Sequence, residues 1–495
     1  MNSQQIPSNF VLGAATAAFQ IEGGADRGPS IWDTFCRVPG AVLDGDDGQV
    51  ACDHYHRYRE DVALMKQMGL DSYRFSTSWA RIFPDGRHLN QAGLDFYSRL
   101  VDELLEAEIK PWLTLYHWDL PQALEDEGGW PSRDTAERFR DYALTVHRAL
   151  GDRVDTWTTL NEPWCSSFLS YTAGAHAPGH QDLGEGMLAS HHLLLGHGWA
   201  TQALREADSN LELGLTLNLT PVQPLTSADK AVAEIVDGQA NRWFLDPLFR
   251  GRYPADIVQE YRRVDEAAAD RFTAAVRPGD LEAISTPIDV LGINYYQGDI
   301  VTAQPQLPAE LAEKFGEFPL PPRGDAPVSR PVSAPTPSAT PIYRPDTSLP
   351  RTAMGWQVDP LLLTELLQRV HEEYTGPAGV HLYVTENGAA FTDVVTDGQV
   401  HDQDRANYLQ WHLGAVLDAQ RLGVDVRGYF YWSFLDNFEW AWGYSQRFGI
   451  VYVNYETQER IVKDSGRLYA EIIATRKLDV EPNTGRVIRR GTLVE

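Results

Sequence analysis

Eight short runs rich in β-branched and aromatic residues recur along the 495-residue chain, and longer stretches with helical periodicity separate them. The runs cover residues 10–20, 72–79, 109–118, 154–163, 211–220, 289–296, 380–388 and 426–436. Nearly continuous apolar runs of this kind are typical of parallel strands that are buried on both faces. Strand and helix alternating eight times predict an α/β fold, a (β/α)8 or TIM barrel, with functional residues at the carboxyl ends of the strands.

The stretches between the runs have the apolar spacing of amphipathic helices, as in residues 53–69, 94–108 and 137–151. In the first of these, Asp53 is placed to cap the start of the helix and Gly69 to end it. One face of this helix is formed by Val62, Met65 and Met68. These signals predict helices that pack against the barrel.

We predict one barrel domain over residues 1–495, because α/β barrels commonly exceed the usual length of a domain. A segment rich in proline, serine and threonine, at about residues 319–350, breaks the strand–helix rhythm. It is either an interdomain linker or a long loop between the sixth and seventh strands. We favour the loop, because neither flank completes a barrel alone. Such a loop would rim the functional face, and we expect it to decorate the surface rather than to contact a ligand.

The formal net charge of −27 disfavours a phosphate backbone or an anionic membrane as a partner. The three cysteines give neither a disulfide framework nor metal-ligand spacing. The first residues, MNSQQIPSNF, lack the positive and apolar segments of a secretory signal, and no apolar run is long enough to span a membrane. We therefore expect a cytoplasmic protein that binds neither nucleic acid nor membranes; a homo-oligomer is possible.

Two glutamates lie where predicted strands end, Glu162 after the fourth run and Glu386 after the seventh. A helix cap or a surface charge is the ordinary role of such a residue. A closed barrel, however, would point both carboxylates into one crevice. Two facing carboxylates suit glycosidic bond hydrolysis, in which one protonates the leaving oxygen and the other attacks the anomeric carbon. The amide of Asn161 could bind a sugar hydroxyl, and Asn387-Gly388 gives a sharp turn after Glu386.

Two motifs around these glutamates, TLNEP (159–163) and VTENG (384–388), resemble the acid/base and nucleophile motifs of glycoside hydrolase family 1. Further blocks resemble the family in the expected order: FQIEGG (19–24), RFSTSWARIFP (74–84), LYHWDLP (115–121), GINYY (292–296), YWSFLDNFEW (431–440), RFGIVYVNY (447–455) and KDS (463–465). The resemblance implies a (β/α)8 barrel that hydrolyses β-linked sugars with retention of configuration. It also implies that no metal and no organic cofactor is needed.

Matched residue by residue, the resemblance implies that Glu162 is the general acid/base and Glu386 the nucleophile. Arg74 and Tyr296 match groups that hydrogen-bond to the nucleophile, and their charge and O–H group would favour its ionised form. The negative charge of Glu386 would in turn raise the pKa of Glu162 and keep it protonated. We treat Cys165, which follows the first motif, as small filler near the site and not as a nucleophile.

The resemblance also implies a substrate-binding set for a small β-glycoside. The residues that match groups on the hydroxyls of the non-reducing sugar are Gln20, His117, Asn161, Glu439 and Trp440. Trp432 matches the aromatic floor under that sugar, Trp356 the aromatic that stacks on the aglycone, and Asn218 a polar neighbour of the aglycone. Taken alone, His117 and Trp432 would be interpreted as core residues.

The sequence therefore predicts a β-glucosidase that hydrolyses short β-glucosides such as cellobiose, a step in cellulose degradation. A β-galactosidase or β-fucosidase of broad specificity is an alternative, because Gln20 and Glu439 can hydrogen-bond either epimer at the 4-position. A 6-phospho-glycosidase is disfavoured, because Glu439 would repel a phosphate. A sugar-binding barrel without turnover is a further alternative, but such a protein would lack one of the two glutamates.

Overall fold

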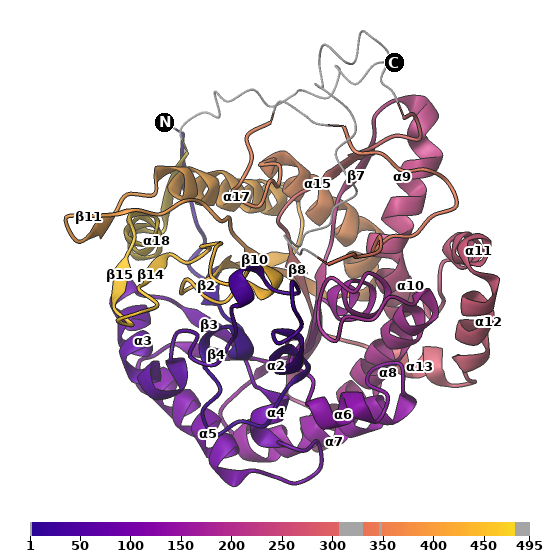
Figure 1. Ribbon diagram of the computed structural model, residues 1–495. Coiled ribbons are helices and arrows are strands. Elements are labelled where there is room, and N and C mark those ends of the chain that lie inside the picture. The colour runs from indigo at the N-terminus through magenta and orange to yellow at the C-terminus, as the bar shows by residue number, and fades with distance from the viewer. Residues whose placement is uncertain (1, 306–329, 346–348, 481–495) are drawn as a thin grey trace.

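The computed structural model describes residues 2–305, 330–345 and 349–480. Its centre is a closed barrel of eight parallel strands, ringed by helices (Figure 1). In chain order the strands are β2 (Val11–Ala15), β3 (Ser72–Ser76), β4 (Lys110–Tyr116), β5 (Thr156–Asn161), β6 (Glu212–Asn218), β8 (Val290–Asn294), β10 (His381–Asn387) and β13 (Val426–Trp432). Each strand overlaps one of the eight predicted runs, and β13 pairs with β2 to close the ring. The barrel prediction is confirmed.

The barrel strands are apolar because both of their faces are covered. Every residue of β3, β8 and β10 is buried. One face of each strand fills the barrel interior and the other supports the outer helices, which is the usual arrangement in a parallel sheet. Side chains at the carboxyl ends of these strands are therefore held on a rigid base.

The outer helices confirm the predicted helical stretches. The longer ones are α3 (His54–Met68), α5 (Gln91–Glu106), α7 (Arg133–Leu150), α8 (Leu183–Ala207), α9 (Lys230–Asp237), α10 (Trp243–Arg250), α11 (Ala255–Val264), α12 (Glu266–Ala275), α15 (Pro360–Val370), α17 (Gln403–Arg421) and α18 (Asp464–Thr475). Short helices are α1 (Ala18–Ile21), α2 (Ile31–Phe35), α4 (Trp79–Ile82), α6 (Gln122–Asp126), α13 (Asp280–Ile284) and α16 (Gly376–Ala378). The described residues form four two-stranded sheets outside the barrel: β1 (Asn2–Gln5) with β16 (Lys477–Val480), β7 (Val222–Pro224) with β9 (Asp299–Val301), β11 (Val395–Thr396) with β12 (Gln399–Val400), and β14 (Val451–Val453) with β15 (Arg460–Val462).

The ends of α3 show one correct and one wrong prediction. Gly69 ends the helix with φ of +74°, a left-handed conformation that favours glycine. Asp53 does not cap the start, because its carboxylate is turned to the ring of His56, 2.6 Å away. The apolar face is buried as expected, and its members are Val62, Met65 and Met68.

The proline-rich segment lies between β8 and β10, the sixth and seventh barrel strands, so the loop interpretation is correct. Residues 319–329 and 346–348 of it lie outside the described residues. The described part is anchored to the outer helices: the carboxylate of Glu260 in α11 accepts hydrogen bonds from the Ser338 hydroxyl (2.6 Å) and the Ala339 amide (2.8 Å). The guanidinium of Arg330 donates to the carbonyls of Gly174 and Gly179.

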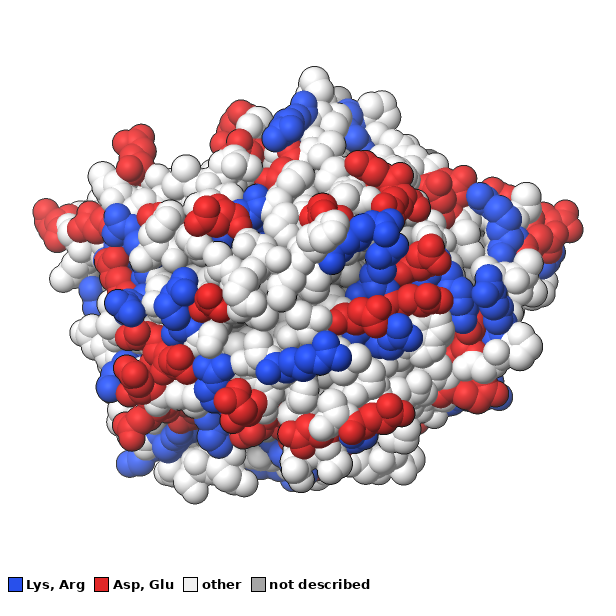
Figure 2. Space-filling view, turned by 90° about the horizontal axis from the view of Figure 1, so that it is seen from below, with Lys and Arg blue, Asp and Glu red and all other residues white. Residues whose placement is uncertain are grey.

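The face seen in Figure 2 carries acidic and basic side chains side by side. Opposite charges are interspersed on this face, which therefore lacks a continuous basic stripe of the kind that binds nucleic acid. In the part of the chain that the structure describes, no helix has both the length and the apolar character needed to cross a membrane.

Candidate active site

A cavity open to solvent lies at the carboxyl ends of the barrel strands, with about 1300 Å³ of space that no atom occupies. Both Glu162 and Glu386 line it, although 223 residues separate them in the chain. Three non-glycine residues at this end of the barrel have left-handed backbones: Trp118 (φ +79°), Glu162 (φ +49°) and Trp440 (φ +49°). Such conformations cost free energy and cluster where a side chain must be aimed at a site.

Glu386 is the last but one residue of β10, and only 2% of its surface is exposed. Its carboxylate accepts a hydrogen bond from Arg74 Nη1 at 2.5 Å and another from the Tyr296 hydroxyl at 2.8 Å. Arg74 comes from β3 and is itself buried. The predicted contacts of Arg74 and Tyr296 with this glutamate are therefore present in the structure.

Glu162 directly follows β5 and is 5% exposed. Its carboxylate accepts a hydrogen bond from Asn294 Nδ2 at 2.7 Å and one from the Cys165 thiol at 3.1 Å. No cation contacts it among the described residues. Asn294 was missed by the sequence analysis, and Cys165 is a hydrogen-bond donor to this carboxylate rather than mere filler.

The two carboxyl groups differ in their electrostatic surroundings. Burial, and next the negative charge of Glu386, raise the pKa of Glu162 to about 8. Burial also raises the pKa of Glu386, but the charge and hydrogen bond of Arg74 act in the opposite direction. Of the two, Glu386 is the group with a cationic partner, so it ionises first. Glu162 then keeps its proton at neutral pH.

Asn161, at the end of β5, connects the hydrogen-bond partners of the two glutamates. Arg74 also contacts Glu386, and Asn294 also contacts Glu162. Its side-chain oxygen accepts hydrogen bonds from Arg74 Nη2 (2.6 Å) and Asn294 Nδ2 (3.1 Å), and its Nδ2 lies 3.1 Å from His117 Nε2. Burial and the charge of Arg74 hold the pKa of His117 well below its usual range, so this ring is neutral. Asn161 and Arg74 do not line the cavity, whereas His117 does.

One group of cavity-lining residues lies at or just after the carboxyl ends of β13 and β4. Trp432, Glu439 and Trp440 line it together with His117, and the rings of Trp432 and His117 are stacked with centroids 5.8 Å apart. Burial and the nearby carboxylates raise the pKa of Glu439 to about 8. Gln20 does not line the cavity; its Nε2 donates to the backbone carbonyl of residue 438 at 2.8 Å and lies 3.5 Å from Glu439 Oε2.

Both predicted aglycone residues, Asn218 and Trp356, also line the cavity. So do residues that the sequence analysis did not single out: Gln297, Asp299, Pro335, Thr336 and Arg344. The last three belong to the proline-rich segment. The expectation that this segment only decorates the surface is therefore wrong for its described part.

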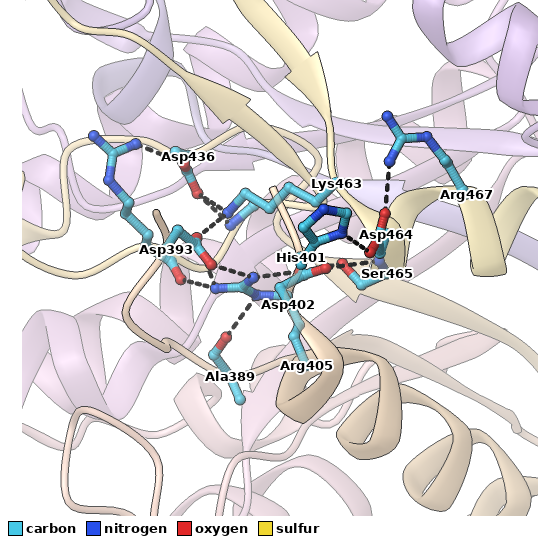
Figure 3. A network of polar contacts seen from close by, with 12 residues as sticks. Ala389, Asp393, His401, Asp402, Arg405, Asp436, Lys463, Asp464, Ser465 and Arg467 are labelled. Atoms are coloured by element: carbon cyan, nitrogen blue, oxygen red, sulfur yellow. Dashed lines mark hydrogen bonds and ion pairs between the residues drawn. The ribbon is translucent and has the colours of Figure 1, made fainter. Parts of the chain in front are cut away.

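A buried ion network holds together the loop that follows Glu386 and the loop that carries Glu439 and Trp440 (Figure 3). Lys463 lies between Asp393, at 2.5 Å, and Asp436, at 2.7 Å, and all three side chains are fully buried. Arg405 pairs with Asp393 at 2.9 Å and donates to the carbonyl of Ala389 at 3.3 Å. The network thus links the loop after β10, which follows Glu386, to the loop after β13. This contact explains the KDS block, to which the sequence analysis gave no role.

Close backbone packing joins the same two loops. Any side chain at Gly388 would collide with the backbone carbonyl of Trp432, so glycine is required there by this contact. The contact holds the start of the loop after β10 against Trp432, which lines the cavity.

Comparisons with known proteins agree with this geometry. The model of the family "Glycosyl hydrolase family 1" matches residues 2–478. Beta-glucosidase A of Thermotoga maritima is 42% identical over 487 residues, which are 97% of this chain and 100% of that protein. A bifunctional beta-D-glucosidase/beta-D-fucosidase of Bifidobacterium breve is 46% identical and covers 94% of this chain and 98% of its own. The crystal structure of a psychrophilic beta-glucosidase from Micrococcus antarcticus has a TM-score of 0.89 at 50% identity and covers 96% of this chain and 100% of its own. The chain therefore belongs to glycosyl hydrolase family 1.

Proposed function

We propose that this glycoside hydrolase is a retaining β-glucosidase that releases terminal non-reducing β-D-glucosyl units from short β-glucosides such as cellobiose. One observation carries the proposal: the buried carboxyl groups of Glu162 and Glu386 line one cavity, and of these two only Glu386 has a cationic partner among the described residues. Double displacement needs one protonated and one ionised carboxyl group in the same site. The names of the relatives, which are beta-glucosidases, support the same activity.

In the first step, the carboxylate of Glu386 attacks the anomeric carbon and forms a glycosyl ester. Glu162 gives its proton to the glycosidic oxygen, and the aglycone leaves. Arg74 and Tyr296 keep Glu386 ionised before the attack, because both donate hydrogen bonds to its charged form.

In the second step, a water molecule must be deprotonated to hydrolyse the ester. The negative charge of Glu386 is lost in the ester, and this charge is one cause of the raised pKa of Glu162. The pKa of Glu162 then falls, so the same group can act as a general base. The product is β-configured glucose.

We assign the end of the cavity at Glu439 and Trp432 to the glucosyl unit. Glu439 offers a carboxyl group and His117 a neutral ring to the sugar hydroxyls, while Trp432 offers an apolar surface to the ring. Asn161 and Gln20 support this set, since they contact His117 and Glu439. A β-fucosidase activity is a second candidate, favoured by the bifunctional relative.

We assign the opposite end, at Trp356 and Asn218, to the aglycone. We also propose that the enzyme acts late in cellulose breakdown, where short soluble β-glucosides such as cellobiose are the substrates. The described cysteines are free thiols, which supports a cytoplasmic location.

The variant Glu386→Ala tests the proposal. It should lose turnover of 4-nitrophenyl β-glucoside, and azide should restore a slow reaction by filling the vacated space at the anomeric carbon. The expected product is the α-glucosyl azide, because azide attacks from the side of the missing Glu386 carboxylate. Attack from the opposite face would give the β-glucosyl azide. A β-azide, or full activity without azide, would contradict the assignment.

A further inference from the structure

Two polar residues of the cavity lining, Arg344 and Asp299, have no role in the reaction described above. An ion pair joins them, with Nε and Oδ2 3.1 Å apart. The side chains are only 15% and 6% exposed. A charged pair so well shielded from water forms stronger hydrogen bonds than one on an open surface.

The order of the strands places this pair on the leaving-group side. The ring runs β10-β13-β2-β3-β4-β5-β6-β8, so β6 lies across the barrel from β2, and β8 lies across from β3. The residues assigned to the glucosyl unit follow β13 and β4. Glu162 follows β5, Asn218 ends β6, and Asp299 lies beyond β8. An aglycone that leaves from Glu162 toward Asn218 therefore extends toward Asp299.

Backbone contacts hold both members of the pair in place. Asp299 begins β9, which pairs with β7, and its amide donates to the carbonyl of Pro221 at 2.8 Å. The residue before Arg344 exchanges two backbone hydrogen bonds with Thr302, at 2.8 and 3.0 Å. The two side chains are thus fixed before a ligand arrives, and little entropy is lost when they bind one.

The chemistry of the pair matches a sugar. A carboxylate accepts hydrogen bonds and a guanidinium donates up to five, so together they suit the neighbouring hydroxyls of a pyranose. Val236 and Ala240 add apolar surface to the same cavity, and Thr336 adds a hydroxyl. Apolar surface with a few well-placed polar groups is the usual make-up of a small-molecule site.

We propose that Asp299 and Arg344 bind the second sugar of the leaving group, so that the enzyme prefers substrates of three or more β-linked units over disaccharides. This inference rests on the proposed β-glucosidase function. It assigns the described part of the proline-rich segment a role in choosing the length of the substrate.

Cellotriose and cellobiose test the proposal, because they differ by the one sugar that would reach the pair. The variant Arg344→Met should lower kcat/KM for cellotriose about tenfold, the effect of losing hydrogen bonds to a charged group. The value for cellobiose and for 4-nitrophenyl β-glucoside should change less than twofold. Asp299→Asn, which keeps the size of the side chain, should show the same selective loss.

Arg427→Met is a matched control, because Arg427 also pairs with an aspartate, Asp425, at 2.9 Å. Arg427 is the second residue of β13, at the opposite end of the strand from the cavity. The Arg427→Met variant should therefore have an unchanged kcat/KM for all three substrates. Equal losses on cellobiose and cellotriose in the Arg344 variant, or no loss on either, would overturn the inference. A wild-type protein that fails to cleave 4-nitrophenyl β-glucoside would instead refute the proposed function.

Discussion

The variant Tyr296→Phe removes one hydroxyl from the cavity and leaves the ring. In the structure this hydroxyl donates to Glu386 Oε2 at 2.8 Å, and the pKa of Tyr296 lies well above its usual value because of burial and the adjacent carboxylates, so the donor stays protonated. A hydrogen bond to a charged group contributes about 1.5–3 kcal/mol. Its loss should raise the pKa of Glu386 by about 1–2 units, since one unit corresponds to about 1.4 kcal/mol.

The assay is the pH dependence of kcat/KM with 4-nitrophenyl β-glucoside. The proposed mechanism predicts that activity falls at low pH as Glu386 becomes protonated. The variant should therefore move this acidic limb to higher pH and lower the maximum about tenfold or more. Tyr295→Phe is the matched control, because its hydroxyl donates to the backbone carbonyl of Asp359 at 2.6 Å and Tyr295 does not line the cavity. An unmoved acidic limb in Tyr296→Phe, or the same shift in both variants, would refute the reasoning.

Three further predictions concern the other carboxyl group and the network behind the site. Glu162→Ala should lower kcat/KM for cellobiose about 10²–10⁴-fold, the usual contribution of a general acid, and should affect the activated nitrophenyl substrate much less; equal losses would remove Glu162 from that role. The basic limb of the wild-type pH profile should lie near the pKa of Glu162, about 8. Cys165→Ala should move this limb to higher pH, because the thiol hydrogen bond favours the ionised carboxylate. A shift to lower pH would contradict this. Lys463→Met leaves Asp393 and Asp436 buried without their shared cation. It should lower the free energy of unfolding in urea by about 3–5 kcal/mol. An unchanged urea midpoint would show that the network contributes nothing to stability.

The sequence predicted the barrel, and it predicted which strand ends bring Glu162 and Glu386 to one cavity, for a physical reason. Barrel strands are buried on both faces, so their apolar runs are visible in the sequence. The groups at their carboxyl ends follow those runs directly, as Glu162 follows β5 and Tyr296 follows β8 at a distance of two residues. Even Asn294, which was missed, lies within the GINYY block at such a strand end, so the signal for it was present.

Contacts made far from the strand ends were not predictable in this way. Arg344 lies in a proline-rich stretch with no periodicity, and only folding brings it to Asp299. The role of Lys463 depends on two aspartates from separate loops, and no spacing in the sequence predicts that these residues are in contact. The failed cap at Asp53 has a local cause, because the His56 ring competes for the same carboxylate.

The most direct test of the account is to treat the enzyme with 2-deoxy-2-fluoro-β-D-glucosyl fluoride and to map the modified residue by peptide mass spectrometry. The fluorine slows hydrolysis of the glycosyl ester, so the covalent intermediate should accumulate. The account predicts a single fluoroglucosyl label on Glu386. A label on another residue, or no label on a folded enzyme that hydrolyses 4-nitrophenyl β-glucoside, would contradict it.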